Sequence, residues 1–190
     1  MTTKHTRLTA RAVAACVTLC IAAASAIAQL SRPEESFLKS AAHHGHAEVQ
    51  ASEVALKKSR HPQVQRYARE VLEAHRASHA ELKALAARKG VELPDGPSPL
   101  QRARIRMLGT LDPSRFDTRY LDEWGVAAHE EAIALYQRAA REARDPEVKV
   151  LAERQLPVLR EHLAAAQALK GRLAPSGEVP ADAASPPASR

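Results

Sequence analysis

Apolar residues recur at intervals of three and four positions along four long segments of the chain, residues 31–59, 62–89, 112–144 and 145–171. This spacing places the apolar side chains along one face of an α-helix. The pattern therefore predicts four amphipathic helices, each of which buries one face against the others.

Short motifs at the ends of these segments support the boundaries. Residues 31–34, with the sequence Ser-Arg-Pro-Glu, are typical of a capping box with a proline in the first turn. Pro62 and Pro113 begin the second and third helices, and Gly90 ends the second helix after a cationic residue. Asp145 is predicted to cap the fourth helix.

The two halves of the chain repeat one another at an offset of 84 residues, since residues 60–64 (Arg-His-Pro-Gln-Val) correspond to residues 144–148 (Arg-Asp-Pro-Glu-Val). Each of these sequences is a short connection between two predicted helices, so each half is predicted to be an antiparallel hairpin. Residues 91–111 join the hairpins and are long enough to cross the bundle, and residues 100–109 are expected to form a short helix within them. The predicted fold is an all-α, ferritin-like four-helix bundle made of two helical hairpins joined by a long crossover.

Four polar residues fall on or beside the inward faces near the middle of the four helices: Glu48, His75, His129 and His162. His75 and His162 occupy positions that the helical period otherwise fills with apolar residues, and Glu48 lies on a face of small residues. Each of the four is about 20–25 Å from the turn of its hairpin at a rise of 1.5 Å per residue. All four are therefore expected to meet at mid-height.

His129 is the least central of the four by this pattern. The period places it on the flank of the third helix rather than on the inward face. The inward positions predicted for that helix are Leu121, Trp124, Ala128, Ala132 and Leu135.

Two interpretations fit this polar layer. Neutral imidazoles and a carboxylate suit a divalent metal such as Fe, Zn or Mn, and the cores of helical bundles commonly hold such ions. Alternatively the layer is structural, and Glu48 pairs with a histidine inside the core. Glu73 and Glu161 precede His75 and His162 without the Glu-x-x-His spacing of di-iron bundles, so a four-carboxylate di-iron oxidase is not expected.

Other histidines are weaker candidates. His43, His44 and His46 spread around the first helix, so only adventitious metal binding at the surface is expected of them. His79 lies one turn from His75, where a pair at i and i+4 can chelate a metal, but it is expected to be a half-exposed neighbour.

Residues 1–28 are predicted to be a signal peptide. Basic residues without an acidic one precede an apolar stretch, residues 12–24, that is too short to span a bilayer comfortably, and residues 26–28 (Ala-Ile-Ala) form a small-x-small cleavage motif. Cys16 ends a sequence that only superficially resembles a lipoprotein motif, because almost no apolar run precedes it. We expect a mature chain that begins at Gln29, has no transmembrane segment and resides in the periplasm, with association with the outer membrane left open.

Removal of the signal peptide changes the composition. Both cysteines leave with it, and 25 basic against 22 acidic residues leave a net charge of +3 in place of +6. With six aromatic residues and no basic run, the sequence offers no nucleic-acid-binding surface. The full chain contains 39 alanines, and this composition favours helices that approach closely in a single domain, residues 31–173. The proline-containing tail, residues 174–190, is predicted to be disordered.

Several motifs carry a family resemblance. In the first hairpin they are residues 37–42 (Phe-Leu-Lys-Ser-Ala-Ala), 47–49 (Ala-Glu-Val) and 82–91 (Leu-Lys-Ala-Leu-Ala-Ala-Arg-Lys-Gly-Val). In the second they are His129, residues 134–136 (Ala-Leu-Tyr) and, most specific, residues 156–163 (Leu-Pro-Val-Leu-Arg-Glu-His-Leu). Over residues 35–172 the chain resembles the bacterial domain of unknown function 4142. The resemblance implies an exported, ferritin-like four-helix bundle and implies no activity.

The function expected from the sequence is binding rather than catalysis. The chain has no Gly-rich phosphate loop, no Gly-x-Ser-x-Gly motif and no cysteine nucleophile. We expect a non-enzymatic periplasmic binding or stress-associated protein, and the alternative is a metal-binding protein with its site at Glu48, His75, His129 and His162. Assembly into a homo-oligomer stays open.

Overall fold

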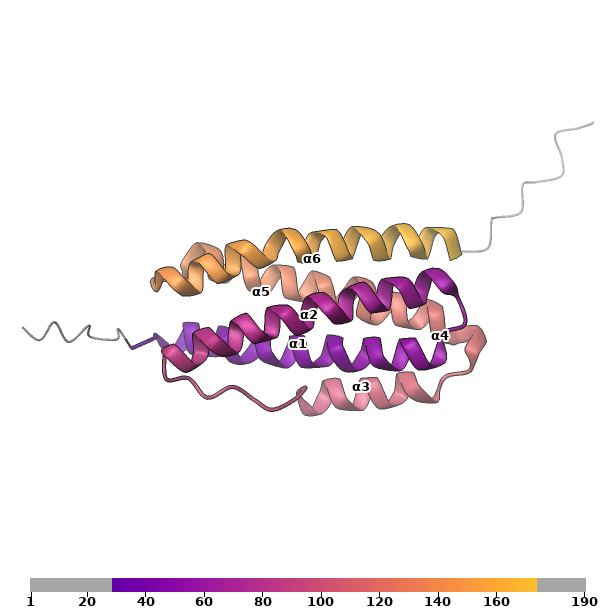
Figure 1. Cartoon of the computed structure of the whole chain (residues 1–190), viewed down its shortest axis with the longest axis horizontal. Helices are drawn as coiled ribbons and strands as arrows, with labels where there is room; N and C mark the ends of the chain where they lie inside the picture. Colours follow the sequence, from indigo (N-terminus) through magenta and orange to yellow (C-terminus); the bar gives the residue numbers. More distant parts are fainter. Residues whose placement is uncertain (1–28, 174–190) are drawn as a thin grey trace, which may run out of the picture.

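A computed structural model describes residues 29–173, so the predicted signal peptide and the predicted tail lie outside the described residues. All regular secondary structure in the described part is helical, which confirms the predicted fold class (Figure 1). The elements in chain order are α1 (Arg32–Lys58), α2 (Pro62–Arg88), α3 (Pro99–Thr110), α4 (Pro113–Tyr120), the π-helical segment η1 (Leu121–Ala127), α5 (Ala128–Glu142) and α6 (Pro146–Leu173). Because α4, η1 and α5 follow one another without a break, they form the third long helix of the bundle.

The crossover gives the bundle its ferritin-like order. Helices α1 and α2 form the first antiparallel hairpin, and the third long helix forms the second hairpin with α6 (Figure 1). After α2 the chain returns along α1 as α3, so the third long helix starts at the end of the bundle where α1 finished (Figure 1). The predicted short helix within the crossover is therefore present, and α2 and the third long helix run in the same direction.

The N-terminus of α1 is fastened to the turn between α5 and α6 through one buried carboxylate. Glu34 Oε2 accepts hydrogen bonds from the Ser31 N–H (2.8 Å) and hydroxyl (2.6 Å). Its Oε1 accepts from the N–H groups of Arg144 and Asp145, both at 2.8 Å. Burial alone would raise the pKa of Glu34, but these hydrogen bonds to the charged form outweigh it and lower the pKa to about 2.

The apolar core falls into two clusters, one toward each end of the bundle. The first combines Phe37 and Leu38 of α1 with the end of α2 and the start of α6. The second combines Phe116 and Tyr120 of α4 with the start of α2 and the end of α6. The polar residues of the predicted layer lie between these clusters, at mid-height.

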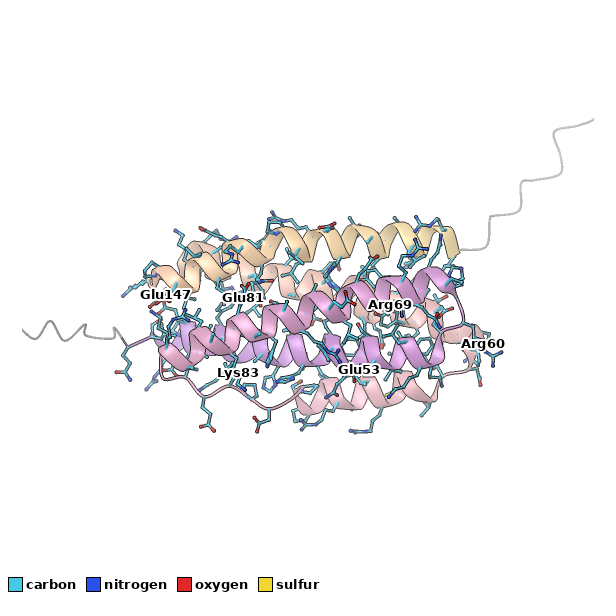
Figure 2. The ribbon with its side chains drawn as sticks, in the orientation of Figure 1. Glu53, Arg60, Arg69, Glu81, Lys83 and Glu147 are labelled. Atoms are coloured by element: carbon cyan, nitrogen blue, oxygen red, sulfur yellow. The ribbon has the colours of Figure 1, made fainter. Side chains whose placement is uncertain are left out.

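Charged residues cover the outside of the helices (Figure 2). Arg76 pairs with Glu53 across α1 and α2 (2.8 Å), and Arg154 pairs with Glu81 across α6 and α2 (3.3 Å). These pairs are exposed, so each contributes well under about 1 kcal/mol. Within residues 29–173, no helix combines the length and the apolar character that crossing a membrane requires.

Candidate metal centre

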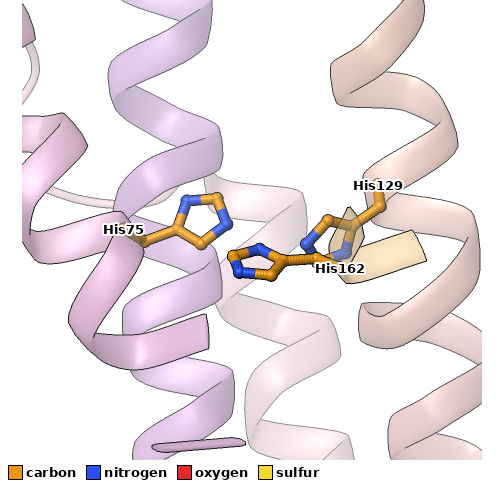
Figure 3. Close-up of side chains that lie close together, drawn as sticks. All are labelled: His75, His129 and His162. Atoms are coloured by element: carbon orange, nitrogen blue, oxygen red, sulfur yellow. The ribbon is translucent and has the colours of Figure 1, made fainter. Parts of the chain in front are cut away.

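Three of the four predicted residues converge at the middle of the bundle: His75 from α2, His129 from the first turn of α5 and His162 from α6 (Figure 3). One ring nitrogen of each histidine lies within 4.8 Å of the corresponding nitrogens of the other two. The ring centroids are 5.4–5.8 Å apart. We call these residues the three-histidine centre.

The three imidazoles are held in their neutral form. His75 and His129 are 9% and 1% exposed, and His162 is half-buried. Burial lowers the pKa of each ring, and neighbouring histidines lower the pKa of His75 and His129 further, to about 4 for His129. A neutral imidazole has the free lone pair that a metal ligand needs.

The π-helical segment corrects the predicted inward face of the third long helix. A π-helical turn holds more residues than an α-helical turn, so it rotates everything that follows it relative to an uninterrupted helix. After η1 the predicted inward residues Ala128 and Leu135 are only partly buried, whereas their successors His129 and Tyr136 are buried. The segment η1 therefore moves His129 from the predicted flank into the core.

The same segment fixes the tautomer of His129. The Ala128 N–H, which in an α-helix would donate to the carbonyl of Trp124, donates instead to the carbonyl of Glu123. The Trp124 oxygen lies 2.9 Å from His129 Nδ1, and because a carbonyl can only accept, Nδ1 carries the proton. The lone pair of His129 is then on Nε2, and a carbonyl that orients a histidine in this way is the usual outer partner of a metal ligand.

The buried nitrogens of the centre have no protein partner among the described residues. They are His75 Nε2, His129 Nε2 and His162 Nδ1. Buried polar side-chain atoms are nearly always hydrogen-bonded, because burial without a partner costs roughly 1–3 kcal/mol each. A polar layer held together by protein hydrogen bonds alone would satisfy these nitrogens, and no protein group among the described residues does so.

Glu48 lies beside the centre but is not part of the three-nitrogen group. Its side chain is buried, and neither carboxylate oxygen has a protein partner among the described residues. Glu48 Oε1 is 3.9 Å from His129 Nδ1, which is too long for a hydrogen bond, and that nitrogen already donates to Trp124. The Glu–His pair that the structural interpretation requires is therefore not formed, and burial raises the pKa of Glu48 well above its ordinary value.

The size of the centre suits one transition-metal ion after a small contraction. Ligand nitrogens at 2.0–2.1 Å from a tetrahedral metal are about 3.3 Å apart, which is up to about 1.5 Å closer than the 4.8 Å limit found here. Three imidazoles occupy three of four tetrahedral positions and leave one position free.

The histidines of α1 have a role that the sequence interpretation missed. His43 Nδ1 lies 2.8 Å from the carbonyl of Gly96, and His46 Nε2 lies 3.2 Å from the carbonyl of Pro94. Both rings therefore hold the crossover against α1. Their spacing of i and i+3 places them on one side of the helix, which is the signal that could have indicated a shared contact.

Comparisons with known proteins agree with this fold. The family model "Domain of unknown function (DUF4142)" matches residues 21–169. The chain belongs to this family. No protein of curated function matches it.

Two solved structures share the fold of this DUF4142 protein. A DUF305 fragment from Deinococcus radiodurans is 21% identical, covers 76% of this chain and 99% of its own length, and superposes with a TM-score of 0.68. CopM in its Cu(I)-bound form is 16% identical, covers 75% of this chain and 98% of its own length, and superposes with a TM-score of 0.63. At these identities the likeness establishes the all-α bundle and nothing about activity.

Proposed function

We propose that this DUF4142 protein binds a single copper or zinc ion at the three-histidine centre. The observation that carries the proposal is the convergence of three histidines, since one ring nitrogen of each lies within 4.8 Å of those of the other two. Each of the three also has a buried ring nitrogen without a protein hydrogen-bond partner among the described residues. A metal ion is the ligand that would satisfy all three lone pairs at once.

The donor set favours copper or zinc over the iron or manganese that the sequence also allowed. Imidazole nitrogens bind copper and zinc well, whereas manganese prefers carboxylate and carbonyl oxygens, and di-iron bundles use several carboxylates. The carboxylate of Glu48 lies 3.9 Å from His129 Nδ1, the nitrogen that faces the Trp124 carbonyl, and Glu48 is not part of the three-histidine centre. The Cu(I)-bound form of CopM, whose chain has the same fold, supports a metal-binding role.

Binding, rather than catalysis, is the role that this geometry supports. The centre lies between two apolar clusters, and His129 is 1% exposed, so the site has no wide access for an organic substrate. We infer that the protein acts after export, as a periplasmic metal-binding or metal-buffering protein. N-terminal sequencing of the exported protein tests the compartment, and an N-terminus at Gln29 is the expected result.

Metal titration of a protein without a His tag tests the function. Copper or zinc at a hundredfold excess over Kd should stabilise the fold by about 2.7 kcal/mol, which raises Tm by roughly 5–10 °C. The variants His75→Ala and His162→Ala should lose this rise. His61→Ala, which removes a histidine from the α1–α2 turn, should keep it. The absence of stoichiometric binding, or an equal rise in all variants, would refute the proposal.

A further inference from the structure

Two further histidines form a pair next to the three-histidine centre, between α1 and α2. His46 of α1 and His79 of α2 face one another with ring centroids 4.3 Å apart. His79 is one helical turn from His75, so the pair adjoins the buried centre. Both rings are half-buried, whereas His75 is buried. The pair therefore lies between the solvent and the centre.

Hydrogen bonding leaves this pair able to bind a metal. His46 Nε2 donates to the carbonyl of Pro94 at 3.2 Å, so the lone pair of His46 is on Nδ1. His79 Nδ1 is buried and has no protein hydrogen-bond partner among the described residues. Imidazoles from two facing helices are a ligand set that copper and zinc accept.

A small cavity touches one residue of this pair, His79, and one residue of the centre, His75. Its volume is about 20 Å³, enough for one water-sized particle, and its lining includes His44, His75 and His79. Gly45 stands in the same wall, where a Cβ atom would come within 3.7 Å of His79 Nδ1. The wall of the cavity therefore includes the imidazoles of the half-buried His79 and of the buried His75.

We propose that His46 and His79 form a receiving site for the copper or zinc ion, which then passes the cavity beside His44 to reach His75 and the three-histidine centre. This inference rests on the proposed function. The transfer is an exchange of metal ligands only: each metal–imidazole bond that breaks is replaced by the next one, and no oxidation or proton transfer is required. Burial supplies the physical reason, because an ion that enters the core must lose its water, and successive imidazoles replace that water stepwise.

The single tryptophan of the chain allows the transfer to be timed. Trp124 is buried, and its carbonyl holds His129, so fluorescence quenching by Cu²⁺ reports arrival at the three-histidine centre. In stopped-flow mixing with Cu²⁺, His46→Ala and His79→Ala should each slow quenching about tenfold or more, because the high local concentration of captured ion is lost. The final amplitude and the equilibrium Kd should equal those of the unmodified protein.

His43→Ala is the matched control, because His43 also holds the crossover but does not line the cavity. Cu²⁺ should quench the fluorescence of His43→Ala at the rate measured for the unmodified protein. His79→Gln is a second variant that retains a polar side chain, and circular dichroism confirms that each variant folds. Quenching at the same rate in every variant, or equal slowing in His43→Ala, would refute the receiving site. Absence of both quenching and stoichiometric copper or zinc binding in the unmodified protein would instead refute the proposed function, and the transfer with it.

Discussion

Acid should destabilise the metal-free bundle through the three-histidine centre. Burial lowers the pKa of His75, His129 and His162 below the ordinary value of 6.5 that each regains when the chain unfolds. Between the two pKa values the unfolded chain binds more protons than the folded one, so protons favour unfolding. The stability is therefore complete above about pH 6.5 and falls as the pH drops toward the pKa of the folded protein.

The magnitude follows from His129, whose pKa in the folded protein is about 4. A shift from 6.5 to about 4 removes about 2 kcal/mol of folding free energy at pH 5 and about 3 kcal/mol at pH 4. His75 and His162 act in the same direction. Since a domain of this size has a total stability of about 5–15 kcal/mol, the centre alone removes a large part of it by pH 4.

Urea unfolding at a series of pH values between 7 and 4, with a chelator present, measures this loss. The variant His129→Gln, which does not titrate, should be less stable at pH 7 but should lose about 2 kcal/mol less than the unmodified protein between pH 7 and pH 5. Zinc should move the acid-induced loss to lower pH, because the metal holds the imidazoles deprotonated. A free energy of unfolding that stays constant between pH 7 and pH 5 would show that the histidines are hydrated or charged in the folded protein.

The parts of this fold that depend on local sequence could be predicted. The helical period, the capping sequence at Ser31 and Glu34, and Asp145 at the start of α6 all act within a few residues, and all appear in the structure. The height argument also holds for His75 and His162, because a helix has a constant rise per residue. These local rules were sufficient to predict that His75 and His162, from two different helices, lie at the same height in the bundle.

The register of the third long helix could not be predicted from the apolar pattern. The positions of Leu121, Trp124, Ala128 and Leu135 fit an uninterrupted α-helix, and nothing in their spacing marks η1. The one local signal is Gly125 inside that segment. A glycine is needed at position 125 because a Cβ atom there would lie 2.9 Å from Ala166 Cβ of the neighbouring helix α6.

The hydrogen-bond partners within the polar layer also required the side chains. A sequence shows that Glu48 and His129 share a level, but it does not show whether they form a hydrogen bond. The structure separates Glu48 Oε1 from His129 Nδ1 by 3.9 Å and gives that nitrogen to Trp124 instead. His129 therefore bonds to one backbone carbonyl and not to Glu48, and no residue pattern encodes this choice of partner.

Two substitutions test the supports of this architecture. Glu34→Gln should lower the free energy of unfolding by about 3 kcal/mol at neutral pH in urea unfolding, because the charged carboxylate, with a pKa of about 2, stabilises the fold above pH 4.5. This stabilisation is lost only as the pH falls from 4.5 toward 2. If the variant and the unmodified protein lost stability equally below pH 4.5, the result would contradict this prediction. Gly125→Ala should cost roughly 1–3 kcal/mol, because the new methyl group would lie 2.9 Å from Ala166 Cβ and push η1 away from α6. That shift should also move the Trp124 carbonyl and weaken copper or zinc binding, which thermal melts with and without metal measure together. Gly171→Ala is the matched control, since nothing lies within 4 Å of its Cβ position in α6, and it should be neutral or stabilising by about 0.5–1 kcal/mol. If Gly125→Ala and Gly171→Ala behaved alike in both measurements, the close contact between η1 and α6 would not position the centre.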